Sequence, residues 1–125
     1  MWSHQYIYYN IQSDKFFSQS KKIEDVISIL LRTNYFKQKN HQSFCNSDNF
    51  PWVDMILVET KDGKFASSDQ KKSFVNLIAI VCLKAEEIDQ SIYINEFLEI
   101  ADKLNWKLFL EEDDDGNQNV EIKKS

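Results

Sequence analysis

A run of ten residues, 74–83, constrains the fold of this chain more than any other part of its sequence, because only Asn76 within it is polar. A continuous apolar run of this length is typical of a strand buried on both faces, in the middle of a sheet. A second β-forming stretch, 52–60, precedes it and is followed by a hairpin signal, Asp-Gly, within residues 61–64. We therefore predict two central strands, with residues 74–83 nearest the middle of the sheet.

Two amphipathic helices are predicted, at residues 23–31 and 94–104, because apolar residues recur there at helical spacing. These residues are Ile23, Val26, Ile27, Leu30 and Leu31 in the first helix, and Ile94, Phe97, Leu98, Ala101 and Leu104 in the second. Ser20 is placed to cap the first helix, and Asp89 or Ser91 to cap the second.

Shorter strands are expected at residues 5–9, 106–110 and 120–122, and residues 33–51 predict a long polar connection with room for a short strand. The order strand, helix, strand, strand, helix, strand is the ferredoxin-like βαββαβ pattern, in which two helices cover one face of an antiparallel sheet. We therefore predict an α+β fold with the other sheet face, or a sheet edge, free for a partner.

Length and composition favour a single domain, 1–125, because 125 residues that are 42% hydrophobic and 14% aromatic suffice for one core. No stretch approaches the roughly 18 to 20 apolar residues that cross a bilayer, and residues 1–6 lack the basic and apolar regions of a signal peptide. The expected location is the cytoplasm. Cys82 is a predicted core residue, and we expect no disulfide with Cys45, which lies among polar residues.

Negative charge gathers toward the C-terminal end of a chain whose formal net charge is −5. Residues 111–125 carry six Asp and Glu against two Lys, whereas residues 1–50 carry six Lys and Arg against four Asp and Glu. Because an acidic chain repels a phosphate backbone, we expect no direct nucleic-acid partner and favour a basic protein as the partner.

The most biased segment is a series of five carboxylates, Glu111, Glu112, Asp113, Asp114 and Asp115. Such a run is commonly a solvated turn, or it is a docking patch whose charge speeds association with a cationic partner. A calcium site is the third alternative, because the first, third and fifth of these carboxylates and Gly116 match the opening of an EF-hand loop. Ile122 would then stand where that loop requires a bidentate carboxylate, so we expect no metal.

Recognisable catalytic and cofactor-binding motifs are missing from the sequence. His4 and His41 lie outside any Cys-x-x-Cys or His-Glu-x-x-His motif, and two glycines, Gly63 and Gly116, are too few for a phosphate-binding loop. A thiolate pair of Cys45 with His41, both in a polar loop, has no oriented geometry. We therefore expect a binding protein without a cofactor, not an enzyme.

The three tryptophans are candidates for core or interface positions. Trp2 is expected to pack near the terminus, and Trp106 to close the core at the start of a strand. Trp52 lies where a loop enters a predicted central strand, and a core position is favoured for it. Its place beside Asp54 also suits an interface anchor, the residue type that dominates binding energy. The candidate partner-binding residues are therefore Trp52, Asp54 and residues 111–115.

Residues 101–117, ADKLNWKLFLEEDDDGN, combine a helix end, a Leu-Asn-Trp step into a strand and an acidic turn. In this arrangement the stretch resembles small immunity proteins of bacterial toxin systems, including the contact-dependent and type VI secretion kinds. The resemblance implies a cytoplasmic protein that binds one cognate toxin domain tightly, often by placing acidic residues against a basic nuclease site.

Two other classes of protein stay open. A small ligand-binding or regulatory domain of ferredoxin-like type would dimerise through its sheet and hold a ligand at a glycine-bearing loop, which the scarcity of glycine disfavours. A subunit of a larger enzyme would expose an apolar face. The reading frame immediately upstream discriminates, because a secreted toxin gene there favours immunity, whereas a transporter or metabolic operon favours a regulator.

Overall fold

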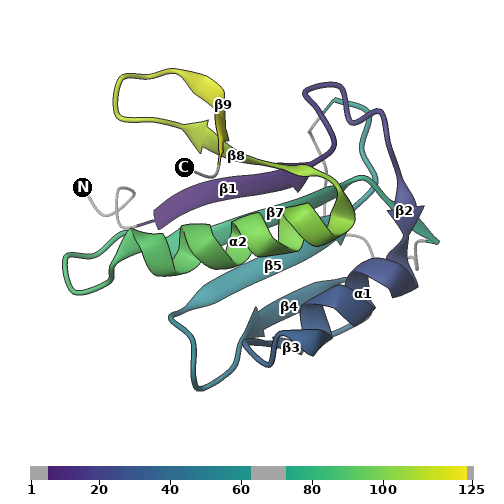
Figure 1. The fold of residues 1–125 in the computed structure, drawn as a ribbon, viewed down its shortest axis with the longest axis horizontal. Coiled ribbons are helices and arrows are strands. Elements are labelled where there is room, and N and C mark those ends of the chain that lie inside the picture. The colour runs from purple at the N-terminus through teal and green to yellow at the C-terminus, as the bar shows by residue number, and fades with distance from the viewer. Residues whose placement is uncertain (1–5, 63–72, 124–125) are drawn as a thin grey trace.

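A seven-stranded antiparallel sheet forms the centre of the computed structural model, which describes residues 6–62 and 73–123 (Figure 1). The strand order is β3-β4-β5-β7-β1-β8-β9. These strands are β1 (Tyr6–Gln12), β3 (Phe36–Gln38), β4 (Ser43–Asn46), β5 (Val53–Val58), β7 (Leu77–Leu83), β8 (Lys107–Glu112) and β9 (Gln118–Ile122). A separate two-stranded sheet pairs β2 (Lys21–Lys22) with β6 (Phe74–Val75).

The apolar run does lie in the middle of the sheet, as predicted, with β5 on one side of β7 and β1 on the other. It is not a single strand, however, because Asn76 interrupts it. The Asn76 side chain accepts a hydrogen bond from the backbone N–H of Thr60 at 2.9 Å and donates one to the Thr60 carbonyl at 2.7 Å. The Asn76 side chain thus pairs with the backbone of Thr60, just beyond the end of β5. The residues before Asn76 form β6, which leaves the large sheet and pairs with β2.

Both helices, α1 (Ile23–Arg32) and α2 (Gln90–Leu104), lie on the same face of the sheet and pack against each other (Figure 1). The predicted apolar faces are buried in part. Val26 and Leu30 of α1 are fully buried, whereas Leu31, predicted on the same face, is 43% exposed. On α2, the ring of Phe97 packs on that of Tyr9 in β1, with 5.6 Å between ring centroids.

The two predicted caps have different outcomes. Asp89 caps α2 by accepting a hydrogen bond from the Ser91 backbone N–H at 3.0 Å, which confirms that prediction. The prediction for Ser20 was wrong, because the N-cap residue of α1 is Lys22, and its side chain makes no capping hydrogen bond. The reason is that β2 leads directly into the helix, so the chain is already held by its strand partner when the helix begins.

The α+β class, the antiparallel sheet and the two helices are confirmed. The sheet has seven strands, whereas the ferredoxin-like order has four. Two strands, β3 and β4, form inside the connection 33–51, where one short strand was expected, and β9 contains the strand predicted at 120–122 and lies at the opposite edge. The connection joins the sheet because its aromatic residues supply core contacts. Phe36 and Phe44 are 3% and 0% exposed.

The buried side chains form one hydrophobic cluster between the sheet and the helices. Cys82 and Trp106 belong to it, as predicted, and Cys82 and Cys45 are free thiols. Within the described residues, neither helix is long and apolar enough to cross a membrane. The predictions for Trp2, for His4 and for the turn at Gly63 lie outside the described residues.

Candidate functional site

The acidic turn between β8 and β9 is built around the carboxylate of Asp113. This carboxylate accepts hydrogen bonds from the backbone N–H of Asp115 at 3.0 Å, and from the backbone and side-chain N–H groups of Asn117 at 2.8 and 3.1 Å. The side-chain and backbone bonds from Asn117 hold the pKa of Asp113 below its usual value. Gly116 completes the turn at a φ of +84°, a conformation that side chains other than glycine rarely adopt. The main structural role of Asp113 is therefore to accept the hydrogen bonds that form the turn.

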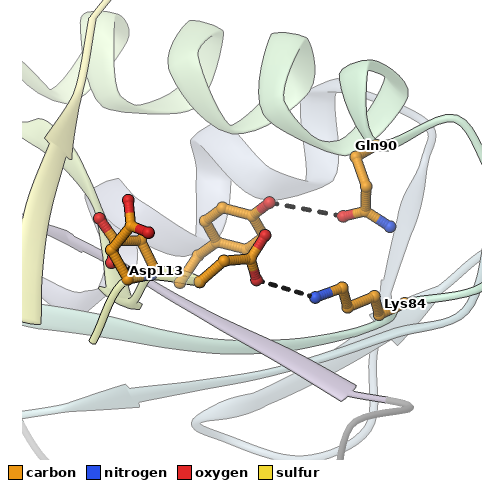
Figure 2. A network of polar contacts seen from close by, with 6 residues as sticks. Lys84, Gln90 and Asp113 are labelled. Atoms are coloured by element: carbon orange, nitrogen blue, oxygen red, sulfur yellow. Dashed lines mark hydrogen bonds and ion pairs between the residues drawn. The ribbon is translucent and has the colours of Figure 1, made fainter. Parts of the chain in front are cut away.

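The other four carboxylates of the run are exposed. Asp114 accepts a hydrogen bond from the Lys84 ammonium at 3.2 Å, in an ion pair that ties the hairpin to the end of β7 (Figure 2). Such an exposed ion pair contributes little to stability. The hairpin is therefore strongly negative, because Lys84 neutralises only Asp114 and leaves the charges of Glu111, Glu112 and Asp115.

The calcium alternative finds no support in this geometry. Asp113, which would be a ligand, already has its two oxygens engaged by N–H groups of its own turn. Across residues 6–62 and 73–123, no group of three or more His, Cys, Asp and Glu side chains is arranged to hold a metal ion.

Trp52 is not a core residue, contrary to the favoured prediction, because 40% of it is exposed. Side chains alternate along a strand, and Val53 is buried toward the helices, so Trp52 and Asp54 project from the opposite face. The backbone at Trp52 is fixed from the helix side, where the Tyr93 hydroxyl donates to its carbonyl at 2.7 Å. Asp54 pairs with the Lys39 ammonium at 2.8 Å.

The open face, by which we mean the sheet face away from α1 and α2, carries a row of large side chains near the start of β1. Tyr6 of β1 lies opposite Leu83 of β7, and Trp52 precedes the β5 residue that lies opposite Cys82. The rings of Tyr6 and Trp52 are 5.8 Å apart between centroids and tilted by 58°, so they bridge the strand between them. Tyr8, two residues along β1, is 49% exposed on the same face.

A groove opens where β8 leaves β1. The pairing of β1 with β8 covers residues 9–12 only, whereas its pairing with β7 begins at Tyr6. Beyond Leu110, β8 continues with β9 as a hairpin that projects away from β1 (Figure 1). The space between them belongs to a groove of about 900 Å³ that also reaches Lys15 and Leu77, near the other end of β1. We call it the acidic groove, because its charged lining residues are Asp62, Glu111, Glu112, Asp113, Asp114, Lys15 and Lys84.

One end of the acidic groove is held by hydrogen bonds that reach the start of α2. The Tyr9 hydroxyl donates to the Gln90 side-chain oxygen at 3.4 Å (Figure 2). The Gln90 side-chain amide donates in turn to the Leu83 carbonyl at 2.8 Å. Burial raises the pKa of Tyr9, so its hydroxyl stays protonated and remains a donor. These bonds fix β1, β7 and α2 relative to one another at the groove.

A second hollow, of about 720 Å³, lies beside α2 and is lined in part by Tyr35, Phe50 and Glu96. Glu96 is 8% exposed, and burial, with a smaller contribution from Glu99, raises the pKa of its carboxyl. A buried carboxyl of this kind costs stability when it ionises.

No protein family matches the chain, and no curated protein or solved structure is significantly similar to it.

The structure brings the seven candidate residues into two neighbouring places. The carboxylates of residues 111–114 line the acidic groove, and Asp115 is exposed in the same turn. Trp52 and Asp54 lie on the open face, and Tyr6 joins the two places because it lines the groove and contacts Trp52. Tyr6, Tyr8 and Lys84 were not among the residues predicted for this surface. Tyrosines at alternate positions of the first strand were the available signal, since they share one face.

Proposed function

We propose that this chain is a cytoplasmic immunity protein, which binds a cognate toxin domain and neutralises it without catalysing a reaction. The observation that carries the proposal is the juxtaposition of the acidic groove with the exposed aromatic row of Tyr6, Tyr8 and Trp52. Carboxylates line one side of this surface and large aromatic side chains the other.

Such a surface suits a basic protein better than other ligands. Aromatic residues at the centre of an interface supply most of the binding energy, and complementary charge around them raises the association rate. The excess of carboxylates over lysines in the groove repels phosphate groups, which disfavours nucleic acid. A toxin that acts on nucleic acid carries the opposite charge at its active site and so complements this groove.

The order β5-β7-β1-β8 of the four inner strands, with both helices on one face, supports a ferredoxin-like βαββαβ core. Such a core is also compatible with the second candidate function, a small ligand-binding or regulatory domain. Ile56, Val81 and Leu83 are only half-buried on the open face, which favours a dimer formed by two such sheets. In that case the aromatic row would face a second copy of this chain.

A growth-protection experiment separates the two candidates. The C-terminal domain encoded by the reading frame immediately upstream is expressed in a sensitive host, with and without this chain. Immunity predicts that the domain stops growth, that this chain restores it, and that the two proteins purify as one complex. The proposal fails if the upstream domain is harmless, or if growth is not restored while this chain is present and folded. A dimer of this chain in sedimentation, without a toxin complex, would favour the regulatory domain.

A further inference from the structure

We infer that the acidic groove takes an extended segment of the partner protein with alternating basic and apolar residues, which pairs with the free edge of β1 as an added strand. The inference rests on the proposed function and supplies its binding mode. The acidic turn alone does not carry it, because the free edge of β1 is an independent observation.

The free edge follows from the strand register. In an antiparallel sheet, the N–H and C=O groups of a strand point alternately to its two neighbours. Residues 6–8 pair with β7 on one side, but pairing with β8 on the other side begins only at Tyr9. Among the described residues, no strand pairs with this side of residues 6–8. Unpaired backbone groups at a sheet edge are a template for a further strand.

The two walls of the groove predict the pattern of the added strand. Tyr6 and Tyr8 project from the open face, whereas Tyr9 packs on Phe97 of α2 and so marks the helix side. Leu110 lies opposite Tyr9, and Glu112 follows on the same side of β8 because side chains alternate. An added strand therefore meets the rings of Tyr6 and Tyr8 on the open face, where Glu111 also projects, and the carboxylate of Glu112 on the helix side.

Lys84 shows which chemistry the carboxylate wall accepts. Its ammonium lies 3.2 Å from Asp114, and the two side chains are 48% and 93% exposed. An ion pair this exposed is weak and exchangeable. A lysine or arginine of the partner segment can therefore replace Lys84 at Asp114, and Lys84 acts as an internal competitor until it does.

The groove and the edge are complementary to a basic chain in charge as well as in shape. Five carboxylates and two lysines line the groove. The whole groove has a volume of about 900 Å³, which lies within the usual range of ligand-binding pockets. Main-chain pairing supplies affinity in strand addition, and the alternate side chains supply specificity.

An NMR titration of the full-length, isotope-labelled protein with three synthetic heptapeptides tests the inference. The first peptide alternates lysine and valine. The second alternates glutamate and valine, and the third is the lysine peptide with its central valine replaced by proline, which keeps the charge but cannot complete a strand ladder. We expect the lysine–valine peptide to slow amide exchange at those N–H groups of residues 6–8 that point away from β7, and to shift the resonances of residues 110–112. It should bind at least about tenfold more tightly than either control peptide.

Matched variants test the side chains. The double variant Glu112→Gln, Asp114→Asn removes two groove carboxylates and should weaken the lysine–valine peptide at least about threefold. The control Glu24→Gln, Asp48→Asn removes two exposed carboxylates elsewhere and should leave binding unchanged. Lys84→Ala removes the internal competitor and should tighten binding. Because all these side chains are exposed, the variants are expected to fold.

Other outcomes overturn the inference. Equal binding of the proline peptide rules out strand addition, and so does a binding site at β3, at β9 or on the open face alone. No binding of the lysine–valine peptide overturns it as well, and concentration-dependent protection of residues 6–8 without peptide identifies a second copy of this chain as the occupant. If the upstream toxin is neutralised while the peptide test fails, only the binding mode is wrong. If the peptide binds as expected and no toxin is neutralised, the binding mode of the groove is supported and the proposed immunity function is wrong.

Discussion

At the scale of single residues, Asp113 and Asp114 are adjacent carboxylates with different tasks. Asp113 accepts the hydrogen bonds that form the turn, whereas Asp114 makes one exposed ion pair. We predict that Asp113→Ala speeds amide exchange at Asp115 and Asn117, because their acceptor is lost. Asp114→Ala removes the same charge and should leave those amides unchanged. Hydrogen exchange followed by NMR measures both, and equal effects of the two variants would contradict the assignment.

The pKa of Asp113 adds a pH dependence to the same turn. Its folded pKa lies below the usual 3.8 because Asn117 donates to the ionised form. A lowered folded pKa stabilises the turn above pH 3.8, and that stabilisation is lost as the pH falls through the folded value. The amide shifts of Asp115 and Asn117 should therefore stay constant above that pH and move toward disordered values below it. A transition above pH 3.8 would have the wrong sign.

The pKa of Glu96 is shifted in the opposite direction, so the predicted pH dependence of stability is also opposite. Its folded pKa is raised above 4.5 by burial, so the wild-type protein loses stability as the pH rises from 4.5 to the folded value. Glu96→Gln keeps the shape but cannot ionise, and we expect it to raise the urea midpoint at neutral pH. The gain should shrink toward zero below pH 4.5. Glu24→Gln, on the exposed surface of α1, is the control and should show no such pH-dependent gain.

At the scale of elements, α1 and β7 supply the centre of the core. Leu30 is fully buried and Ile80 is 3% exposed, so Leu30→Ala or Ile80→Ala leaves a cavity. We expect either change to lower the free energy of unfolding by about 2 to 5 kcal/mol. Leu31→Ala, the same substitution one position along α1 at a residue that is 43% exposed, should cost less than about 1 kcal/mol. Chemical denaturation measures all three, and a small loss at both buried sites would contradict the assigned core.

The elements also show why some features were predictable from sequence and others were not. The apolar spacing of α1 and α2 is local, so it identified both helices and buried residues such as Val26 and Leu30, but it also placed the exposed Leu31 on a buried face. The break at Asn76 depends on Thr60, which is distant in sequence, and no local pattern indicates it. Trp52 was predicted in the core because it is large and apolar. Which side chains of a strand are buried depends, however, on which face of the sheet the helices cover, and the sequence around Trp52 does not indicate this. The role of Asp113 in the turn was hidden within a uniform acidic run.

At the scale of the whole molecule, the charge of the hairpin should govern how fast a basic partner arrives. Charges exposed to solvent act over about 8 Å at physiological salt, so they affect encounter more than the lifetime of a complex. For the toxin of the proposed function, Glu111→Gln, Asp114→Asn and Asp115→Asn together should slow association about tenfold at low salt and much less at high salt. This set spares Asp113 and therefore the turn.

Trp52→Ala should instead act on dissociation, because a desolvated aromatic anchor holds a complex that has already formed. Both rate constants are measured across a series of salt concentrations, with Glu24→Gln, Asp25→Asn and Asp48→Asn as a charge-matched control. Unchanged association of the hairpin variant at low ionic strength would show that the hairpin is not part of the encounter surface.

The position of β1 in the sheet has a consequence for folding during synthesis. Ile11 lies opposite Ile78 on one side and opposite Leu108 on the other, so both neighbours of β1 come from far along the chain. Closing such long loops costs entropy before any contact repays it, which slows folding. While the chain emerges from the ribosome, α1 and the β3-β4-β5 meander can form from local contacts, but β1 must wait until β7 and β8 have been translated. Although β1 precedes both of its neighbours in the chain, it is thus enclosed only after both have been made, and a nascent chain stalled before β8 would hold β1 by one edge alone.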